Sequence, residues 1–365
     1  MVESRSIERY AMSVTGPINV TDLGKTLVHE HLLVDFLESR SRESSPVALT
    51  DSDKWTAPIS LSNYYEMRWN PAEYSVALGL HDSQQAIDAI HLLVEHGGKS
   101  IVEVTPIGVG RNPAGLRELS EITGLTIVMG TGFLTREFHP SYLDDMTEGA
   151  IASLLIEECV DGVGPSKIRP GVIGEIGLSW PADSREVSVL NAAVMAQNEV
   201  GLPLSIHPGR HPSAPLEAAR LVQNAGGDTA RVAIGHLERT LFSISELVAL
   251  AETGVRLEFD LFGQESRHYP YGDVDIPNDG GRIAMIAELF HRGRGDQVLI
   301  SHDVSSPLRL SANGGEGYHH IFKRVLPVMA RRGFSNQELE MIVVENPAAF
   351  LAARPGSVQG MATSQ

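Results

Sequence analysis

The sequence predicts an α/β fold, a closed (β/α)8 or TIM barrel. Short runs rich in β-branched residues alternate along the chain with amphipathic helical patterns, the order that produces a parallel sheet with helical crossovers. Eight such runs follow one another, and eight strand and helix units fit a closed parallel barrel better than an open sheet. We therefore predict that residues 1–365 form a single barrel domain.

Eight segments are predicted as the barrel strands. Each is short and is bounded by polar residues or glycine. The first is KTLVHEH, at about residues 25–31, and the last is QVLISHD, at about residues 297–303. The six between them are 99–105, 125–132, 171–178, 202–207, 231–237 and 255–261.

Amphipathic stretches lie between these segments and are predicted as helices. Several of them end at glycine, where a left-handed cap costs little. The clearest are 82–97, 184–201, 243–254 and 281–293.

Two segments are too long or too irregular for ordinary connections. Residues 32–81, rich in Ser, Trp, Tyr and Asn, predict an elaborated loop above the first strand. Residues 304–320 form a Gly-rich excursion after the eighth strand. Both leave the carboxyl end of a strand, where barrel enzymes place their active sites, so both are candidate walls or lids over a pocket. The tail, residues 355–365, is expected to be frayed.

Composition narrows the class of protein and its partners. Hydrophobic residues make up 42% of the chain and charged residues 21%, which is ordinary for a globular protein with a sizeable core. The chain has 29 Lys and Arg against 46 Asp and Glu, a net charge of -17. Nucleic acid is therefore not an expected partner, because phosphate binding needs clustered positive charge.

The same residues bear on the compartment. The single cysteine, Cys159, excludes an internal disulfide, and the opening stretch MVESRSIERY lacks the apolar core of a secretory signal. No uninterrupted apolar run approaches the roughly 20 residues that a membrane-spanning helix requires. We therefore expect a cytoplasmic protein that does not insert into membranes.

Two histidines close the first predicted strand. In His29-Glu30-His31, alternation along the strand directs both imidazoles to the barrel interior and Glu30 outward. This spacing alone is a weak signal, since two hydrogen-bonded core histidines would give the same pattern.

Further ionisable residues fall at the same rim of the predicted barrel. Glu175 lies in the fourth strand, His207 ends the fifth, His236 is near the end of the sixth, and Asp303 closes the eighth. Such side chains are costly inside a barrel unless they are paired or bind a metal ion. Four histidines and two carboxylates are ligands that suit zinc and related divalent ions, and they exceed what one tetrahedral ion uses. We therefore predict two divalent metal ions.

Several segments together resemble the phosphotriesterase family of the amidohydrolase superfamily, in particular its phosphotriesterase-related branch, which includes proteins named resiniferatoxin-binding. The resemblance runs from about residue 15 to about residue 350. It rests on GKTLVHEHLL, GVIGEIGLSW, LSIHPGR, AIGHLERT, LEFDLFG, SHDVSSPLRL, GGEGYHHIF and ENPAAFL. It implies a TIM barrel of the metallo-dependent hydrolase type, and because relatives are often dimers it makes a homodimer one expectation.

The resemblance also implies how the ligands divide. His29, His31 and Asp303 would hold the more buried ion, and His207 and His236 the more exposed one. Zn²⁺ is the default metal, with Mn²⁺, Co²⁺ or Fe²⁺ as alternatives.

A bridging ligand joins the two ions in this family. Organophosphate-degrading members and related lactonases use a lysine carboxylated on its side-chain nitrogen, but the fourth strand here contains no lysine and offers Glu175. Glutamate at this place is the pattern of the phosphotriesterase-related branch. Lys167, which precedes the strand, is the alternative bridge if the strand begins elsewhere.

Two adjacent divalent ions predict a mechanism. They lower the pKa of a shared water from about 15.7 towards about 7, so hydroxide becomes available as the nucleophile. The exposed ion would polarise the substrate oxygen, and Asp303 would act as the base and proton shuttle. The chain has no GxSxG motif, and Cys159 lies in a helical run, so a covalent enzyme intermediate is not expected.

The expected substrate is a small carboxylic ester, lactone or amide attacked by the hydroxide that bridges the metal ions. A phosphotriesterase acting on organophosphate triesters is one alternative. A non-catalytic protein that binds a small molecule such as resiniferatoxin is the other. Arg210, Arg267 and Tyr269 are candidate substrate-binding residues because they follow the fifth and seventh strands. The competing interpretation of the two arginines is surface ion pairing.

Overall fold

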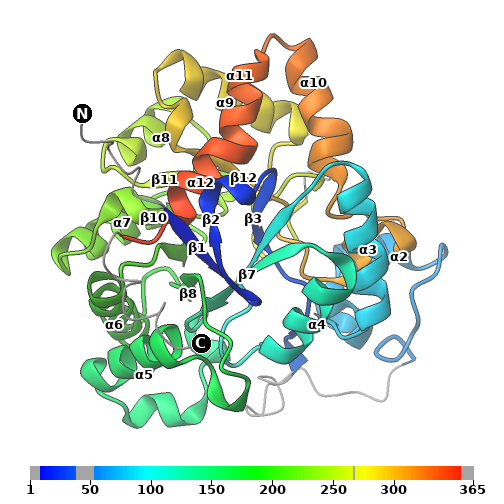
Figure 1. The fold of residues 1–365 in the computed structure, drawn as a ribbon. Helices are drawn as coiled ribbons and strands as arrows, with labels where there is room; N and C mark the ends of the chain where they lie inside the picture. The colour runs from blue at the N-terminus through cyan, green and yellow to red at the C-terminus, as the bar shows by residue number, and fades with distance from the viewer. Residues whose placement is uncertain (1–8, 38–52, 266–267, 355–365) are drawn as a thin grey trace.

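Eight parallel strands form the centre of the molecule in the computed structural model, which describes residues 9–37, 53–265 and 268–354 (Figure 1). Each strand pairs with the next one along the chain. The first and last strands meet where Asp303 N donates to His29 O at 3.2 Å and His29 N donates to Ser301 Oγ at 3.0 Å. The predicted barrel is therefore confirmed. Its strands are β3 (Thr26–Glu30), β6 (Ser100–Glu103), β7 (Thr126–Thr131), β8 (Val172–Gly177), β9 (Leu204–His207), β10 (Val232–Ile234), β11 (Arg256–Phe259) and β12 (Val298–Ile300).

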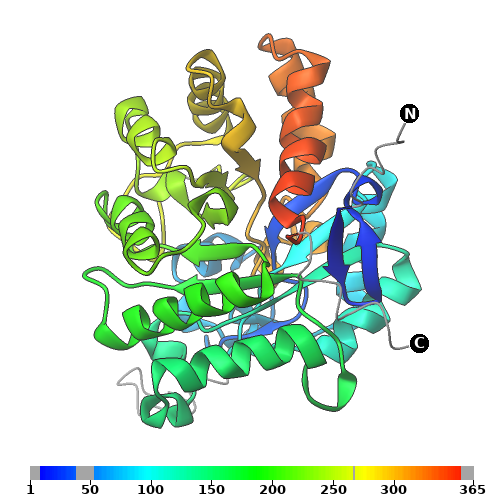
Figure 2. The same cartoon turned by 60° about the vertical axis from the view of Figure 1, so that its left-hand side comes forward.

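Helices surround the strands, as the two views of the ribbon show (Figures 1 and 2). The four helices predicted from amphipathic periodicity correspond to α3 (Ser83–Glu95), α6 (Ser184–Val200), α8 (Ile244–Ala251) and α9 (Asp279–His291). None of the helices in the described part of the chain combines the length and apolarity needed to cross a membrane. The remaining α-helices of the described residues are α2 (Tyr64–Trp69), α4 (Pro113–Thr123), α5 (Glu148–Asp161), α7 (Ala214–Asn224), α10 (Leu326–Arg331), α11 (Asn336–Glu340) and α12 (Asn346–Leu351).

Local sequence explains where several helices begin and end. Asp183 and Glu186 form a reciprocal capping box at the start of α6, and Ser243 begins α8 in the same way. Gly124 and Gly201 follow α4 and α6 in the left-handed conformation, which only glycine adopts without strain.

An antiparallel hairpin covers one end of the barrel. It comprises β1 (Tyr10–Ser13) and β2 (Gly16–Asn19), and Val14 N beyond β1 donates to Ile127 O near the start of β7. Ala11 of the hairpin joins an apolar cluster with Val28, Val102, Val128 and other strand residues. The amino-terminal end of the barrel is therefore packed with hydrophobic side chains, which leaves the carboxyl end for polar chemistry.

The two irregular segments meet over that carboxyl end. Within residues 32–81, β4 (Val34–Asp35) pairs antiparallel with β5 (Gly79–Leu80). Tyr64 OH donates to Leu308 O at 2.6 Å, which joins this segment to the excursion after β12. The middle of the first segment and the predicted frayed tail, 355–365, lie outside the described residues.

Close packing between neighbouring strands predicts the cost of one added methyl group. In Gly130→Ala the new Cβ would overlap the backbone oxygen of Gly174 on the adjacent strand, so we expect the free energy of unfolding to fall by about 1–3 kcal/mol. Gly149→Ala in α5 is the matched control, because its added Cβ meets nothing within 4 Å beyond its chain neighbours and the backbone of its own helix. Urea unfolding of the two variants should show a loss for the first only; equal stabilities would contradict the packing described.

Candidate metal centre

The six residues singled out as ligands from the sequence lie together at the carboxyl ends of five barrel strands. Four of them are buried, and His207 and Asp303 are partly exposed. They are His29 in β3 and His31 just beyond it, Glu175 in β8, His207 at the end of β9, His236 beyond β10, and Asp303 beyond β12.

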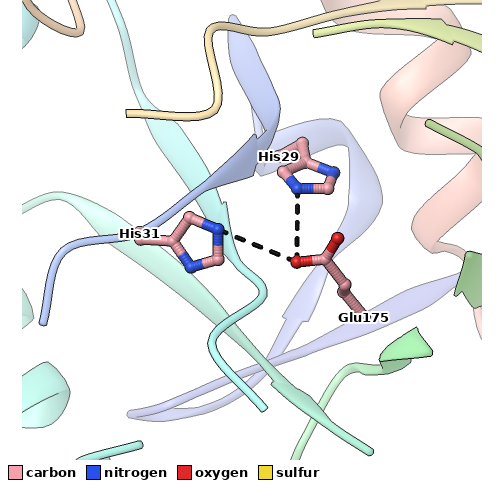
Figure 3. A group of neighbouring side chains, drawn as sticks. All are labelled: His29, His31 and Glu175. Atoms are coloured by element: carbon pink, nitrogen blue, oxygen red, sulfur yellow. Dashed lines mark ion pairs between the residues drawn. The ribbon is translucent and has the colours of Figure 1, made fainter. Parts of the chain in front are cut away.

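The carboxylate of Glu175 lies between two pairs of histidines. Its Oε1 is 3.7 Å from His29 Nε2 and 3.8 Å from His31 Nε2 (Figure 3). Its Oε2 is 2.6 Å from His207 Nδ1 and 3.3 Å from His236 Nε2. The two oxygens of one side chain thus face two different sets of imidazole nitrogens, which is the arrangement that a bridging ligand requires.

Asp303 completes the first of these sets. Its Oδ1 is 3.2 Å from His31 Nε2 and 3.8 Å from His29 Nε2. Asp303 and His236 both have positive φ angles, 57° and 54°. Left-handed backbone is unfavourable for residues other than glycine and persists where the surrounding structure requires it, often at functional sites. Here it lies at the turns that present these two side chains.

A second layer of polar groups holds three of the imidazoles. Each partner contacts the ring nitrogen that faces away from Glu175, so the ring orientation is fixed from behind. The contacts are His29 Nδ1 to Glu258 Oε1 at 2.9 Å, His31 Nδ1 to Thr105 Oγ1 at 2.9 Å, and His236 Nδ1 to Asp260 Oδ1 at 2.7 Å.

The donor set fits divalent metal ions. His29 Nε2 is buried and has no hydrogen-bond partner among the described residues, although it faces two carboxylates. A nitrogen that binds a metal ion must offer its lone pair, and no hydrogen bond among the described residues occupies that position on His29 Nε2. Two groups whose ligand atoms lie within 4.8 Å of one another share Glu175: one with His29 and His31, the other with His207 and His236.

A third group joins His29, His236 and Asp260. We assign Asp260 to the second layer, because both of its oxygens accept from the backbone N–H of His236. Its Oδ1 also contacts the His236 ring and its Oδ2 lies 3.5 Å from His29 Nδ1, so this carboxylate orients two of the candidate ligands.

The electrostatic environment favours ligand forms for several of these groups. Burial raises the pKa of the Glu175 carboxyl, but its interactions with the His207 and His29 imidazoles outweigh burial and hold the pKa well below its ordinary value. Burial and the nearby charge of Arg239 lower the pKa of His207 to about 3, so its imidazole is neutral at pH 7. Burial lowers the pKa of His236, but Asp260 raises it to about 9. A metal ion that binds His236 must therefore displace a proton.

A cavity of about 360 Å³ opens above the cluster. Its lining includes five of the six candidate ligands, namely His31, Glu175, His207, His236 and Asp303. The polar residues Arg210, Arg239 and Tyr269 line it as well, as do apolar residues that include Phe36, Leu134 and Phe138. A space of this volume accommodates a small organic molecule.

The predicted substrate-binding residues and the alternative bridging lysine differ in their distance from the cluster. Arg210 is exposed and Tyr269 is buried, and both line the cavity. Arg267 lies outside the described residues. Lys167 lies in the turn before β8, at the end of that strand opposite to the cluster, and is therefore not placed to bridge two ions. Glu175 lies at the centre of the cluster.

Sequence reasoning missed Glu258, Asp260 and Arg239. The signal for the first two was present in LEFDLFG, where two acidic residues alternate along a strand that otherwise reads as apolar. Arg239 follows His236 by three residues in GHLERT, and only the fold of the short helix Leu237–Arg239 brings it back to His207.

The fold and the cluster together are those of a barrel hydrolase with a candidate metal centre. The chain belongs to the phosphotriesterase family, whose model matches residues 11–351. The family resemblance read from the sequence is therefore confirmed.

Named relatives and solved structures cover nearly the whole chain. It is 38% identical to the N-acetyltaurine hydrolase of Salmo salar over 341 residues, which is 93% of this chain and 97% of the relative. It is 36% identical to the N-acetyltaurine hydrolase of Homo sapiens over 348 residues, which is 95% of this chain and 99% of the relative.

Two crystal structures show the same fold. The resiniferatoxin-binding protein from Rhodobacter sphaeroides superposes with a TM-score of 0.87 at 33% identity, covering 94% of both chains. The phosphotriesterase homology protein from Escherichia coli, complexed with phosphate in its active site, gives a TM-score of 0.72 at 25% identity, covering 90% of this chain and 99% of that one.

The arrangement around Glu175 predicts a metal-dependent stability. Protein supplied with Zn²⁺ should melt several degrees above protein treated with a chelator, because an ion that binds only the folded state stabilises it by about 2.7 kcal/mol at one hundred times its Kd. Glu175→Gln should reduce this difference sharply, since it removes the shared carboxylate. Glu288→Gln, on the exposed face of α9, is the control and should melt like the natural protein. Identical melting with and without chelator would show that no ion binds here.

Proposed function

We propose that this protein is a metal-dependent hydrolase that cleaves the amide bond of a small N-acyl compound. The observation that carries the proposal is the position of Glu175, whose two oxygens face separate histidine pairs. Membership of the phosphotriesterase family supports hydrolysis. The relatives named N-acetyltaurine hydrolase support an amide among the ester, lactone and amide substrates expected from the sequence.

The six side chains are suited to hold two divalent ions, with Zn²⁺ as the first choice. When bound, such ions lower the pKa of a water molecule and polarise a carbonyl oxygen. His29, His31 and Asp303 would hold the deeper ion, His207 and His236 the outer one, and Glu175 both.

Asp303 is placed to move a proton. Its side chain is 20% exposed and lines the cavity, whereas His29 beneath it is fully buried. Burial raises the pKa of Asp303, but the hydrogen bond with His31 and the charges of His236 and His29 outweigh this and keep it ionised at neutral pH. An ionised carboxylate beside the attacking water can accept its proton.

Amide hydrolysis also requires that the departing nitrogen receive a proton. As the water oxygen bonds to the carbonyl carbon, the proton accepted by Asp303 is delivered to the nitrogen, and the carbon–nitrogen bond breaks to give a carboxylic acid and an amine. His31, whose Nε2 is 3.2 Å from Asp303 Oδ1, holds the carboxylate in place for both transfers.

Two other activities have specific support. Phosphate in the active site of the Escherichia coli protein favours a phosphorus-centred substrate, and the name of the Rhodobacter sphaeroides protein favours binding without catalysis. The complete ligand set argues against binding alone, because a non-catalytic barrel has no need to keep six converging costly polar side chains.

A substrate panel tests the proposal. Purified protein with its metal should hydrolyse N-acetyltaurine or another N-acyl amine faster than an aryl acetate, a lactone or a paraoxon-like triester, because the amide relatives are the more similar in sequence. Release of amine and of nitrophenol measures the rates. Hydrolysis of the triester alone would favour a phosphotriesterase over an amide hydrolase. Binding of a substrate without any turnover would favour a non-catalytic binding protein.

Asp303→Asn tests the proton transfer. The variant keeps the size of the side chain but loses its basicity, so kcat should fall about 100-fold or more. Elemental analysis should show that metal is largely retained. Asp88→Asn, on the exposed surface of α3, should have the activity of the natural protein. An unchanged kcat in Asp303→Asn would remove this residue from the mechanism.

A further inference from the structure

We infer that Arg239 and Arg210, together with Tyr269, form a subsite for an anionic group at the far end of the substrate, a sulfonate or a carboxylate joined to the amide nitrogen by a short linker. This inference rests on the proposed amide hydrolysis and specifies which amides are cleaved. Arg239 is the central residue of the subsite.

Arg239 is a buried cation that contacts only neutral groups. Its side chain lines the cavity and the residue is 4% exposed. Nη1 donates to Tyr269 OH at 2.8 Å, Nη2 donates to Pro208 O at 2.9 Å, and Nη2 is also 2.9 Å from His207 Nε2. Among the described residues, Nε is buried without a partner and no carboxylate lies within ion-pair distance of the guanidinium. A buried positive charge without a counter-ion is unfavourable unless an anion is supplied.

A second arginine approaches the same phenol. Arg210 Nε lies 3.5 Å from Tyr269 OH, and the guanidinium lies 5.9 Å from the centres of the Tyr269 and Tyr271 rings. Glu137 lines the cavity as well, and its charge helps to raise the pKa of Arg210, but the two side chains form no ion pair among the described residues. Burial raises the pKa of Tyr269, yet the charges of Arg239 and Arg210 outweigh burial and lower it. Two cations therefore converge on one hydroxyl, a geometry that suits the several oxygens of a sulfonate or carboxylate.

The subsite lies one imidazole ring away from the candidate metal centre. His207 Nδ1 is 2.6 Å from Glu175 Oε2, and its other nitrogen, Nε2, is 2.9 Å from Arg239 Nη2. A substrate whose carbonyl lies over Glu175 therefore brings its far end to Arg239 only if the linker is short.

Metal binding would also free a donor of Arg239. In the proposed ligand set His207 binds through Nδ1, so its Nε2 carries a hydrogen and cannot accept from Arg239 Nη2. The two donors then face each other, and Nη2 needs another acceptor. An anionic substrate provides one, whereas an uncharged substrate of the same length does not.

Three substrates of equal chain length test the subsite. N-acetyltaurine carries a sulfonate, N-acetyl-β-alanine a carboxylate, and N-propylacetamide no charge. We expect Arg239→Met and Arg210→Met to lower kcat/KM for the two anionic amides about 10- to 100-fold, mostly through KM, because each removes a hydrogen bond to a charged group. In Arg210→Met, whose side chain contacts no candidate ligand among the described residues, turnover of N-propylacetamide should change less than about twofold, since this substrate makes no such bond. Arg292→Met, at the exposed residue that caps the C-terminus of α9, is the matched control.

Calorimetry with ethanesulfonate and with propionate gives a readout that does not depend on catalysis. The purified protein and Arg292→Met should bind at least one of these anions, and the two subsite variants should bind it more weakly. Should Arg239→Met fail to fold, Arg210→Met decides, because its side chain is exposed. The anion with the higher kcat/KM in the natural protein identifies the substrate class.

The outcomes separate the two proposals. If amides are hydrolysed but Arg239→Met and Arg210→Met keep the ratio of anionic to neutral rates, the subsite is wrong and the hydrolase stands. If no amide is hydrolysed, yet ethanesulfonate or propionate binds and the variants lose that binding, the subsite stands and amide hydrolysis is wrong.

Discussion

The structure depends on one buried carboxylate, that of Glu175. In the described part of the chain this carboxylate pairs with histidines and with no Lys or Arg. A carboxylate that is 2% exposed is costly unless nearby positive charge or a metal ion offsets the loss of water. Four imidazoles, carried by the ends of the three strands β3, β9 and β10, supply that environment. The barrel brings them together only when its first and last strands close, as the bond from Asp303 N to His29 O shows. Closure of the barrel and assembly of the site are therefore one event.

The polar groups at the carboxyl end of the barrel extend further than the ligands. Glu30 is turned away from His29 and His31, as strand alternation predicts, and accepts from the backbone and ring of His302. Glu103 accepts from Thr105, which in turn contacts His31. These buried acids hold strand ends and imidazoles in fixed orientations, at a cost that the burial of the apolar clusters offsets. The apolar clusters thus stabilise the barrel, and the polar groups gathered at its carboxyl end form the candidate site.

The sequence predicted the elements that depend on periodicity, and it placed the candidate ligands because those residues end strands. It failed where geometry arises in turns. The left-handed conformation of His236, with φ of 54°, leads the chain into a short helix that returns Arg239 to His207. No pattern of hydrophobicity encodes that return. Asp260 was missed for another reason: acidic residues inside a strand were considered only as ligands, whereas this one orients a histidine.

The contact between Arg239 and His207 limits how independent specificity can be from catalysis. In barrels of this kind loops vary while strand ends keep the chemistry, so substrate preference can change without loss of the reaction. Here the candidate specificity residue touches a candidate ligand directly. If His207 binds an ion through Nδ1, a negatively charged side chain at position 239 would accept the hydrogen on its Nε2, raise the basicity of that ligand and repel an anionic substrate. A change at this single position would therefore alter both the metal centre and the substrate, whereas a change at Arg210, which touches no ligand among the described residues, would alter the substrate alone.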